Sequence, residues 1–383
     1  SAKTSSRPMF IYFACQHGAE SFLKSEMETV APSAKFAFSR PGFVTFRTED
    51  SFSPNAINQL PLTFARTRGI SVGRTGKEQA TDEARADYIL NTLADIDTPV
   101  LSSVSQKPSI VSSINQIHVW QRDSKIPGED GFEPGRTEVA DTAGHIIRER
   151  LQIDSKIGIN RIAKSGQLVF DCVLVEPDQW WFGYHVAEGT STRWPGGVYS
   201  LRLPEHAVSR AYLKMEESIR WSQLPLQAGD TCVEIGSSPG GSCQALLDRG
   251  MNVIGIDPAQ MHESVLAHAN FTHHRARAAD LKRSAFSEAK WLFSDSNVAP
   301  NYTLDSVEHI VENRRVNLHG LVLTLKLMQP ELAEQIPFYI ERVKKWGYQY
   351  VRLRQLAFNR REVCMVAMKS RSYRRRRPKS RVS

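Results

Sequence analysis

Four charged residues in the C-terminal half of the chain have the side chains needed to take a proton from a weak acid such as a hydroxyl group. Lys326 lies inside the apolar segment Leu321–Leu327, where an unpaired ammonium group would be costly. Lys214 lies on a predicted helix, Asp295 follows an apolar strand, and Glu362 begins the last predicted strand. Burial or a second lysine lowers the pKa of a lysine, whereas carboxylates oppose that change and orient the amine. We interpret the four residues as a proton-transfer group.

Each of the four residues also has a structural interpretation when it is taken singly. Lys214 could be a solvated helix residue, Asp295 could cap a loop, and Glu362 could be an edge-strand charge. Lys326 is the hardest to explain in this way, because buried lysines need a partner. Two lysines and two carboxylates together are therefore more informative than any one of them.

A second chemical signal is the glycine-rich segment VEIGSSPGG at residues 233–241, which follows an apolar strand and opens a helix. Glycines there permit a tight turn and close approach of a ligand to the backbone. Asp257 ends the next predicted strand, 21 residues after Gly236, where an acidic side chain would accept hydrogen bonds from ribose hydroxyls. The candidate cofactor-binding residues are Glu234, Gly236, Ser237, Ser238, Pro239, Gly240, Gly241, Asp257, Asp280 and Asp295.

The exact glycine pattern distinguishes between two cofactors. A nicotinamide dinucleotide site requires Gly-x-Gly-x-x-Gly, whereas this chain has Gly-Ser-Ser-Pro-Gly-Gly. That difference favours S-adenosylmethionine. A glycine-rich turn without a ligand is the structural alternative, and the acidic residue at the expected distance argues against it.

Alternating strands and helices after residue 209 are expected to position these residues. Ser209 is a predicted N-cap for a helix that continues to Leu224. The predicted strands are 231–235, 252–256, 291–294, 320–327, 348–353 and 363–368, and the predicted helices are 241–249, 304–315 and 331–346. This order predicts an open, mostly parallel α/β sheet of the Rossmann-like kind, with the last two strands forming an antiparallel hairpin.

The N-terminal half has a different pattern, typical of α+β modules. A strand at 9–14, a helix at 19–30 and two strands within 35–47 form a first module. A second module follows, with helices near 84–94 and 141–151 and strong strands at 167–175 and around Trp180. We therefore divide the chain into residues 1–75, 76–200, 201–368 and a tail, 369–383.

Composition bounds the class of protein. The 383 residues carry a net charge of +8, and eight basic residues without an acidic one lie in the tail, which could attract phosphates. No apolar run is long enough to cross a membrane, so we expect a cytoplasmic protein. The five cysteines are odd in number and lack Cys-x-x-Cys spacing, so we expect neither disulfides nor a metal site.

The glycine segment, together with Lys214, Asp295, Lys326 and Glu362, resembles the FtsJ-type RNA 2′-O-methyltransferases, whose signature is a Lys-Asp-Lys-Glu tetrad on a Rossmann-like sheet. The segment SRAYLKMEE at 209–217 is closest to the RlmM-type subgroup, and LPLTFAR at 60–66 is similar to part of that subgroup's N-terminal region. The resemblance implies a ferredoxin-like module, a THUMP RNA-binding module, S-adenosylmethionine as cofactor and a cytidine ribose of large-subunit ribosomal RNA as substrate. It also implies that Lys326 accepts the proton, while the other three residues place and tune it.

Two departures from the family pattern lie beside the glycine segment. Glu234 stands where the family usually has aspartate, and Ser242 stands where an aromatic residue often occurs. Two other functions remain open at this point: a catalytically silent RNA-binding or ribosome-assembly protein with the same fold, and a methyltransferase that acts on a small molecule or a protein. The long N-terminal half favours RNA over a small molecule.

Overall fold

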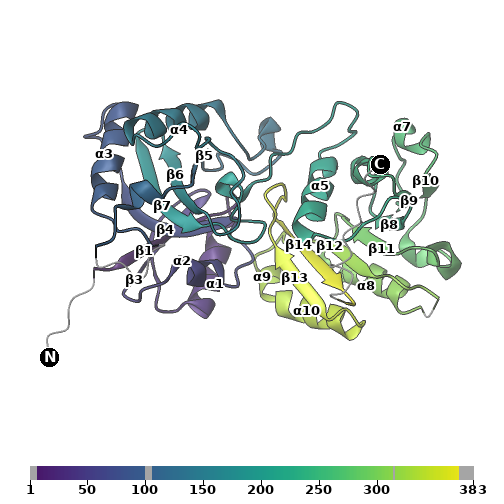
Figure 1. The fold of residues 1–383 in the computed structure, drawn as a ribbon. Coiled ribbons are helices and arrows are strands. Elements are labelled where there is room, and N and C mark those ends of the chain that lie inside the picture. Colours follow the sequence, from purple (N-terminus) through teal and green to yellow (C-terminus); the bar gives the residue numbers. More distant parts are fainter. Residues whose placement is uncertain (1–6, 100–105, 314, 371–383) are drawn as a thin grey trace. The chain divides into compact units, whose positions relative to one another are not determined.

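The computed structural model describes residues 7–99, 106–313 and 315–370, and it divides into two compact units, Ser1–Ser200 and Leu201–Ser383. Each unit contains one seven-stranded sheet (Figure 1). Most of the predicted basic tail, from residue 371 onward, lies outside the described residues. Among the residues described, no helix is long and apolar enough to span a membrane.

The N-terminal unit is built on a sheet with the strand order β2-β3-β1-β4-β7-β6-β5. Its neighbouring strands are antiparallel except for β5 and β6, which are parallel. The strands are β1 (Met9–Ala14), β2 (Lys35–Arg40), β3 (Phe43–Thr48), β4 (Thr67–Arg74), β5 (Gln116–Gln121), β6 (Leu168–Glu176) and β7 (Gln179–Val186). The helices are α1 (Glu20–Val30), α2 (Pro54–Asn58), α3 (Asp82–Ala94) and α4 (Glu138–Arg150).

This sheet runs through the expected boundary between residues 75 and 76. Strand β4, from the first predicted module, pairs with β7 from the second. Helices α3 and α4 bury apolar residues such as Ile89 and Ile147 in one core with β5, β6 and β7. The ferredoxin-like and THUMP-like modules stay predictions. In the structure, strands from both predicted segments belong to one sheet.

The C-terminal unit has the strand order β10-β9-β8-β11-β12-β14-β13. The first five strands in that order are parallel, and β14 is antiparallel to both β12 and β13. The strands are β8 (Thr231–Ile235), β9 (Asn252–Ile256), β10 (Phe271–His274), β11 (Trp291–Ser294), β12 (Gly320–Lys326), β13 (Tyr350–Arg354) and β14 (Glu362–Met368). The helices are α5 (Ala211–Ser222), α6 (Gly241–Leu247), α7 (Glu263–Leu266), α8 (Pro300–Val311), α9 (Glu331–Glu334) and α10 (Ile336–Lys345).

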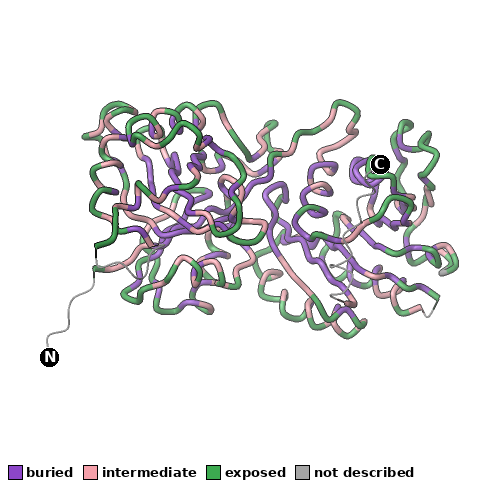
Figure 2. Tube along the Cα trace, in the orientation of Figure 1, coloured by how far each residue is buried: buried purple, intermediate pink, exposed green. Residues whose placement is uncertain are grey.

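This topology is the α/β, Rossmann-like arrangement that the sequence predicts, with the expected antiparallel hairpin at its edge. The central strands β8, β11, β12 and β14 are almost wholly buried (Figure 2). The parallel strands are nearly continuous in apolar residues because both faces of the sheet are covered. Their carboxyl ends therefore form the edge at which polar side chains and ligands can meet.

Two predicted helices differ from the structure for identifiable reasons, and a third, predicted at 304–315, forms four residues earlier as α8. Ser209 does not cap α5. The N-cap residue is Arg210, whose side chain makes no capping hydrogen bond. The Ser209 hydroxyl instead lies against Gly241, where a Cβ would come within 2.2 Å of it. The predicted helix 331–346 is two helices that meet at Gln335. Pro337 in the first turn of α10 lacks an N–H, so it starts a new helix rather than continuing α9.

Candidate active site

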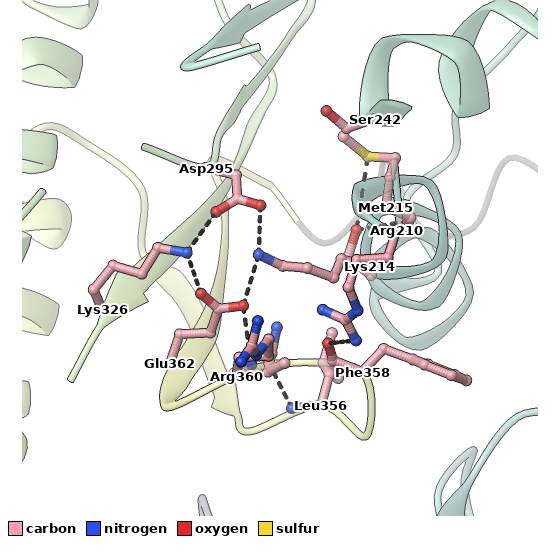
Figure 3. A network of polar contacts seen from close by, with 12 residues as sticks. Arg210, Lys214, Met215, Ser242, Asp295, Lys326, Leu356, Phe358, Arg360 and Glu362 are labelled. Carbon is pink, nitrogen blue, oxygen red and sulfur yellow. Dashed lines mark hydrogen bonds and ion pairs between the residues drawn. The ribbon is translucent and has the colours of Figure 1, made fainter. Parts of the chain in front are cut away.

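The four predicted proton-transfer residues meet in one closed ring of ion pairs, which we call the tetrad (Figure 3). The Lys214 Nζ lies 2.5 Å from Asp295 Oδ2 and 2.6 Å from Glu362 Oε1. The Lys326 Nζ lies 3.1 Å from Asp295 Oδ1 and also contacts Glu362 Oε2. Each ammonium group thus bridges both carboxylates, and each carboxylate binds both ammonium groups.

Three neighbouring strands and one helix bring the tetrad together. Asp295 directly follows β11, and Lys326 ends β12, its parallel neighbour. Glu362 begins β14, where it lies directly opposite Lys326 in the antiparallel register. Side chains opposite one another in such a pair have Cβ atoms about 5 Å apart, close enough for an ion pair. Lys214 reaches the same point from α5.

The tetrad is sheltered from solvent, which strengthens its electrostatics. The exposed fractions of the side chains are 11% for Lys214, 14% for Lys326, 19% for Asp295 and 1% for Glu362. Burial by itself would lower the pKa of Lys214, but the charges of Asp295 and Glu362 outweigh it and raise that pKa above its ordinary value. Burial likewise opposes the charged form of Asp295, yet the two lysines hold the pKa of its carboxyl below its usual range. Lys214 is therefore a firmly charged member of the group.

The glycine segment forms a turn between β8 and α6, which we call the glycine loop (residues 236–241). Gly236 has φ +75°, and a Cβ there would lie 2.4 Å from the Ser296 hydroxyl and 2.9 Å from the Asp295 carbonyl. Gly240 has φ +117° and leaves no room for a Cβ against Val265. The loop is thus packed against the residue that carries one tetrad carboxylate.

The remaining predicted cofactor residues differ in their surroundings. The Ser238 N–H donates to Asp257 Oδ2 at 3.0 Å, and the Ala259 N–H donates to Asp257 Oδ1 at 2.8 Å, so Asp257 fixes the loop at the end of β9. The Ser237 hydroxyl is buried without a hydrogen-bond partner. Asp280 lies on a short 3₁₀ turn, exposed and paired with Arg277.

Glu234 is fully buried, and both of its oxygens bind α6. Its carboxylate accepts hydrogen bonds from the Ser242 hydroxyl and from Cys243 Sγ at 2.9 Å. These contacts explain the two departures from the family pattern, since the longer acid at 234 reaches the small hydroxyl residue at 242. Burial raises the pKa of Glu234 to about 7, although the two hydrogen bonds oppose that shift. The cofactor role of Glu234 stays a prediction.

The donor set and the shape of the loop fit S-adenosylmethionine. Gly236 and Gly240 occupy positions that a Cβ would block, and the unpartnered Ser237 hydroxyl lies between them in the sequence. No group of three or more potential metal ligands occurs in the part of the chain that the structure describes. All five cysteines are buried and unbridged.

Sequence analysis assigned no role to residues 355–361, the turn between β13 and β14. The Arg360 N–H donates to Glu362 Oε1 at 3.1 Å, and the Asn359 Oδ1 accepts the Leu356 N–H at 2.7 Å. Such main-chain contacts have no sequence signature, because almost any residue can supply an N–H. Arg210 and Glu217, from the segment 209–217, bind this turn.

Comparison with known proteins finds similarity in both units of the chain. Residues 207–336 match the model of the FtsJ-like methyltransferase family. That match confirms the predicted resemblance to the FtsJ-type methyltransferases, and it agrees with S-adenosylmethionine as the methyl donor.

Full-length relatives extend the similarity to the N-terminal unit. The chain is 27% identical to Ribosomal RNA large subunit methyltransferase M of Tolumonas auensis, over 96% of this chain and 98% of that one. It is 26% identical to the protein of the same name from Laribacter hongkongensis, over 84% of this chain and 87% of that one. Among solved structures, TrmN from Thermus thermophilus covers 94% of this chain and 100% of its own, at 13% identity and a TM-score of 0.35.

We expect Gly236→Ala to weaken S-adenosylmethionine binding at least tenfold, since the new Cβ collides with Ser296 and displaces the Asp295 main chain. Isothermal titration calorimetry measures the change. Gly250→Ala is the matched control: Gly250 also has a left-handed φ of +78°, but its nearest neighbour is only Ala228. Both variants should lose about 1–2 kcal/mol of stability from the backbone conformation alone. Equal affinities in the two variants would contradict a cofactor role for the glycine loop.

Glu234→Gln should change how stability depends on pH. In the wild type the folded-state pKa, about 7, lies above the ordinary value of an unfolded glutamate, about 4.3, so the folded chain holds a proton that the unfolded chain has lost. The stabilisation is therefore complete below pH 4.3 and is lost as the pH rises through 7. Between pH 5 and 8 the wild type should lose on the order of 2 kcal/mol of unfolding free energy relative to the variant.

Urea unfolding of both proteins at pH 5 and pH 8 measures this difference. Glu216→Gln, which alters a carboxylate paired with Arg249 nearer the surface, serves as the control. Its free energy of unfolding should change with pH as that of the wild type does. If the free energies of unfolding of the wild type and Glu234→Gln change equally between pH 5 and pH 8, the carboxyl group of Glu234 is ionised throughout this range.

Proposed function

We propose that the protein transfers a methyl group from S-adenosylmethionine to a ribose 2′-hydroxyl of RNA, with a cytidine of large-subunit ribosomal RNA as the target. The observation that carries this proposal is the closed tetrad at the carboxyl edge of the sheet, beside the glycine loop. A ribose hydroxyl is a poor nucleophile that must lose a proton, and the tetrad offers a place for it. The relatives named Ribosomal RNA large subunit methyltransferase M support the choice of RNA.

Within the tetrad, we assign Lys326 as the proton acceptor. Lys214 is held in its charged form by two carboxylates, so it is unsuited to take up a proton. Lys326 stands at the end of β12, at the carboxyl edge of the parallel strands, and it has to release its ammonium proton before it can act as the acceptor. Asp295 and Glu362 orient the Lys326 amine, while Lys214 balances their charge.

Bound S-adenosylmethionine supplies a methyl group on a positively charged sulfur. The methyl group would pass from bound S-adenosylmethionine to the 2′-oxygen, and the Lys326 amine would take the proton that this hydroxyl loses. The protein contributes position and a proton acceptor, which are the main needs of such a displacement. The Lys326 ammonium then returns its proton to solvent.

The N-terminal unit supports RNA rather than a small molecule as the substrate. We infer that residues 1–75 form a ferredoxin-like module, and that residues 76–200 form a THUMP-like module that binds RNA. The basic tail, residues 369–383, adds positive charge that attracts phosphates. Small-molecule methyltransferases rarely carry an additional unit of this size.

Lys326→Ala should reduce methyl transfer at least 100-fold, the usual contribution of a positioned proton acceptor, with S-adenosylmethionine affinity little changed. The measurement is transfer of labelled methyl groups to total RNA that lacks the modification. In the wild-type reaction the label should survive alkaline hydrolysis in a dinucleotide, because a methylated 2′-oxygen cannot attack the adjacent phosphate.

Lys345→Ala, which removes an exposed lysine at the end of α10, is the control and should keep wild-type turnover. Near-normal turnover in Lys326→Ala would overturn the assignment of the acceptor. Absence of label from all RNA, with intact S-adenosylmethionine binding, would instead indicate another acceptor molecule or a catalytically silent RNA-binding protein.

A further inference from the structure

The β13–β14 turn, residues 355–361, leads directly into Glu362, and a second carboxylate holds it from the side. Glu217, on α5, accepts the Ala357 N–H at 3.0 Å through Oε2 and the Phe358 N–H at 2.8 Å through Oε1. Its side chain is almost completely buried, with 1% of its surface exposed. Hydrogen bonds to an ionised acceptor are about twice as strong as neutral ones, so this is a firm attachment.

Arg210, the residue just before α5, also binds this turn. Its guanidinium donates from Nη2 to the Phe358 carbonyl at 3.0 Å (Figure 3). The main chain at residue 358 is therefore held through both its N–H and its C=O by side chains from one helical segment. The turn cannot shift relative to α5 without losing three hydrogen bonds.

The same helix carries the tetrad member Lys214, three residues before Glu217, and residues at this spacing share one helix face. Lys214 binds the side chain of Glu362, while Glu217 binds the main chain that precedes it. Helix α5 thus determines the position of the Lys214 ammonium group and, through the turn, that of the Glu362 carboxylate to which this group binds.

Contacts within the turn transmit this restraint to Glu362. The Arg360 N–H donates to Glu362 Oε1, the oxygen that also binds Lys214. The Arg361 carbonyl accepts the Leu327 N–H at 2.7 Å, which joins the turn to the end of β12. Arg361 has φ +49°, a conformation that a non-glycine residue keeps only where its surroundings enforce it.

We propose that Glu217 is a positioning residue for the methyl-transfer reaction, acting through the β13–β14 turn on Glu362 and so on the tetrad. This inference rests on the function proposed above. A neutral side chain at position 217 would leave at least one buried N–H of the turn without a full partner, and the turn would relax. A displacement of about 1 Å in a catalytic group can cost on the order of 100-fold in rate.

The test compares Glu217→Gln with Glu216→Gln, the same substitution at the neighbouring position of α5, where the carboxylate binds Arg249. Hydrogen exchange, followed by mass spectrometry on peptides covering residues 355–361, reports on the attachment without requiring activity. We expect Glu217→Gln to lose amide protection there, and Glu216→Gln to keep it. Retained protection in Glu217→Gln would overturn the proposal.

Kinetics then separate positioning from general stability. Glu217→Gln should lower kcat by about 10- to 100-fold with the KM for S-adenosylmethionine changed less than about threefold, because the loss is in alignment rather than in binding. In a Glu362→Gln background, the same substitution should lower kcat by less than about threefold, since residues that act through one another are not additive. Glu217→Asp, which keeps the charge, should lower kcat less than Glu217→Gln does.

Two kinetic results would refute the proposal: wild-type kcat in Glu217→Gln despite lost protection, or full multiplication of the Glu217→Gln and Glu362→Gln effects. A wild-type enzyme that methylates no RNA would refute the proposed function instead. In that case, hydrogen exchange still decides whether Glu217 holds the turn.

Discussion

Buried charge is the constraint on which the C-terminal unit depends. Two ammonium groups and two carboxylates are withdrawn from water at one point, and each would be strongly unfavourable there without the others. Their net charge is zero, and every charged group has two partners of opposite sign. This requirement determines how the surrounding elements must lie, since β11, β12, β14 and α5 each have to deliver one side chain to the same place.

The register between β12 and β14 meets part of this requirement. A shift of one residue would turn either Lys326 or Glu362 to the opposite face of the sheet. The direct pairing of these two residues holds that register in place, and the apolar residues of both strands, which are buried on both faces, support it. Helix α5 contributes two side chains: Lys214 binds Glu362 in the tetrad, and Glu217 binds the turn before β14.

The glycine loop is connected to the same centre through Asp295. Gly236 packs against the main chain of Asp295, so the turn expected to hold the cofactor and the carboxylate that orients Lys326 share one backbone contact. Glu234, on the strand β8 that leads into the loop, binds Ser242 and Cys243 of α6. A substitution on either side of this contact therefore affects both the glycine loop and the tetrad.

The sequence by itself determined the residue types and most of the elements: the glycine segment, the tetrad residues, and the alternation of strands and helices that places polar side chains at the ends of parallel strands. Local patterns carry that information, because strand and helix periods and turn residues act over a few positions. It did not reveal that Ser209 faces Gly241, that Glu234 binds α6, or that one sheet joins the two N-terminal modules across β4 and β7. The sequence also did not reveal the hydrogen bonds of Glu217 to residues 357 and 358. These bonds join groups about 140 residues apart, and their donors are main-chain N–H groups, which carry no sequence signature. Such contacts depend on which elements pack together, and only the tertiary structure decides that.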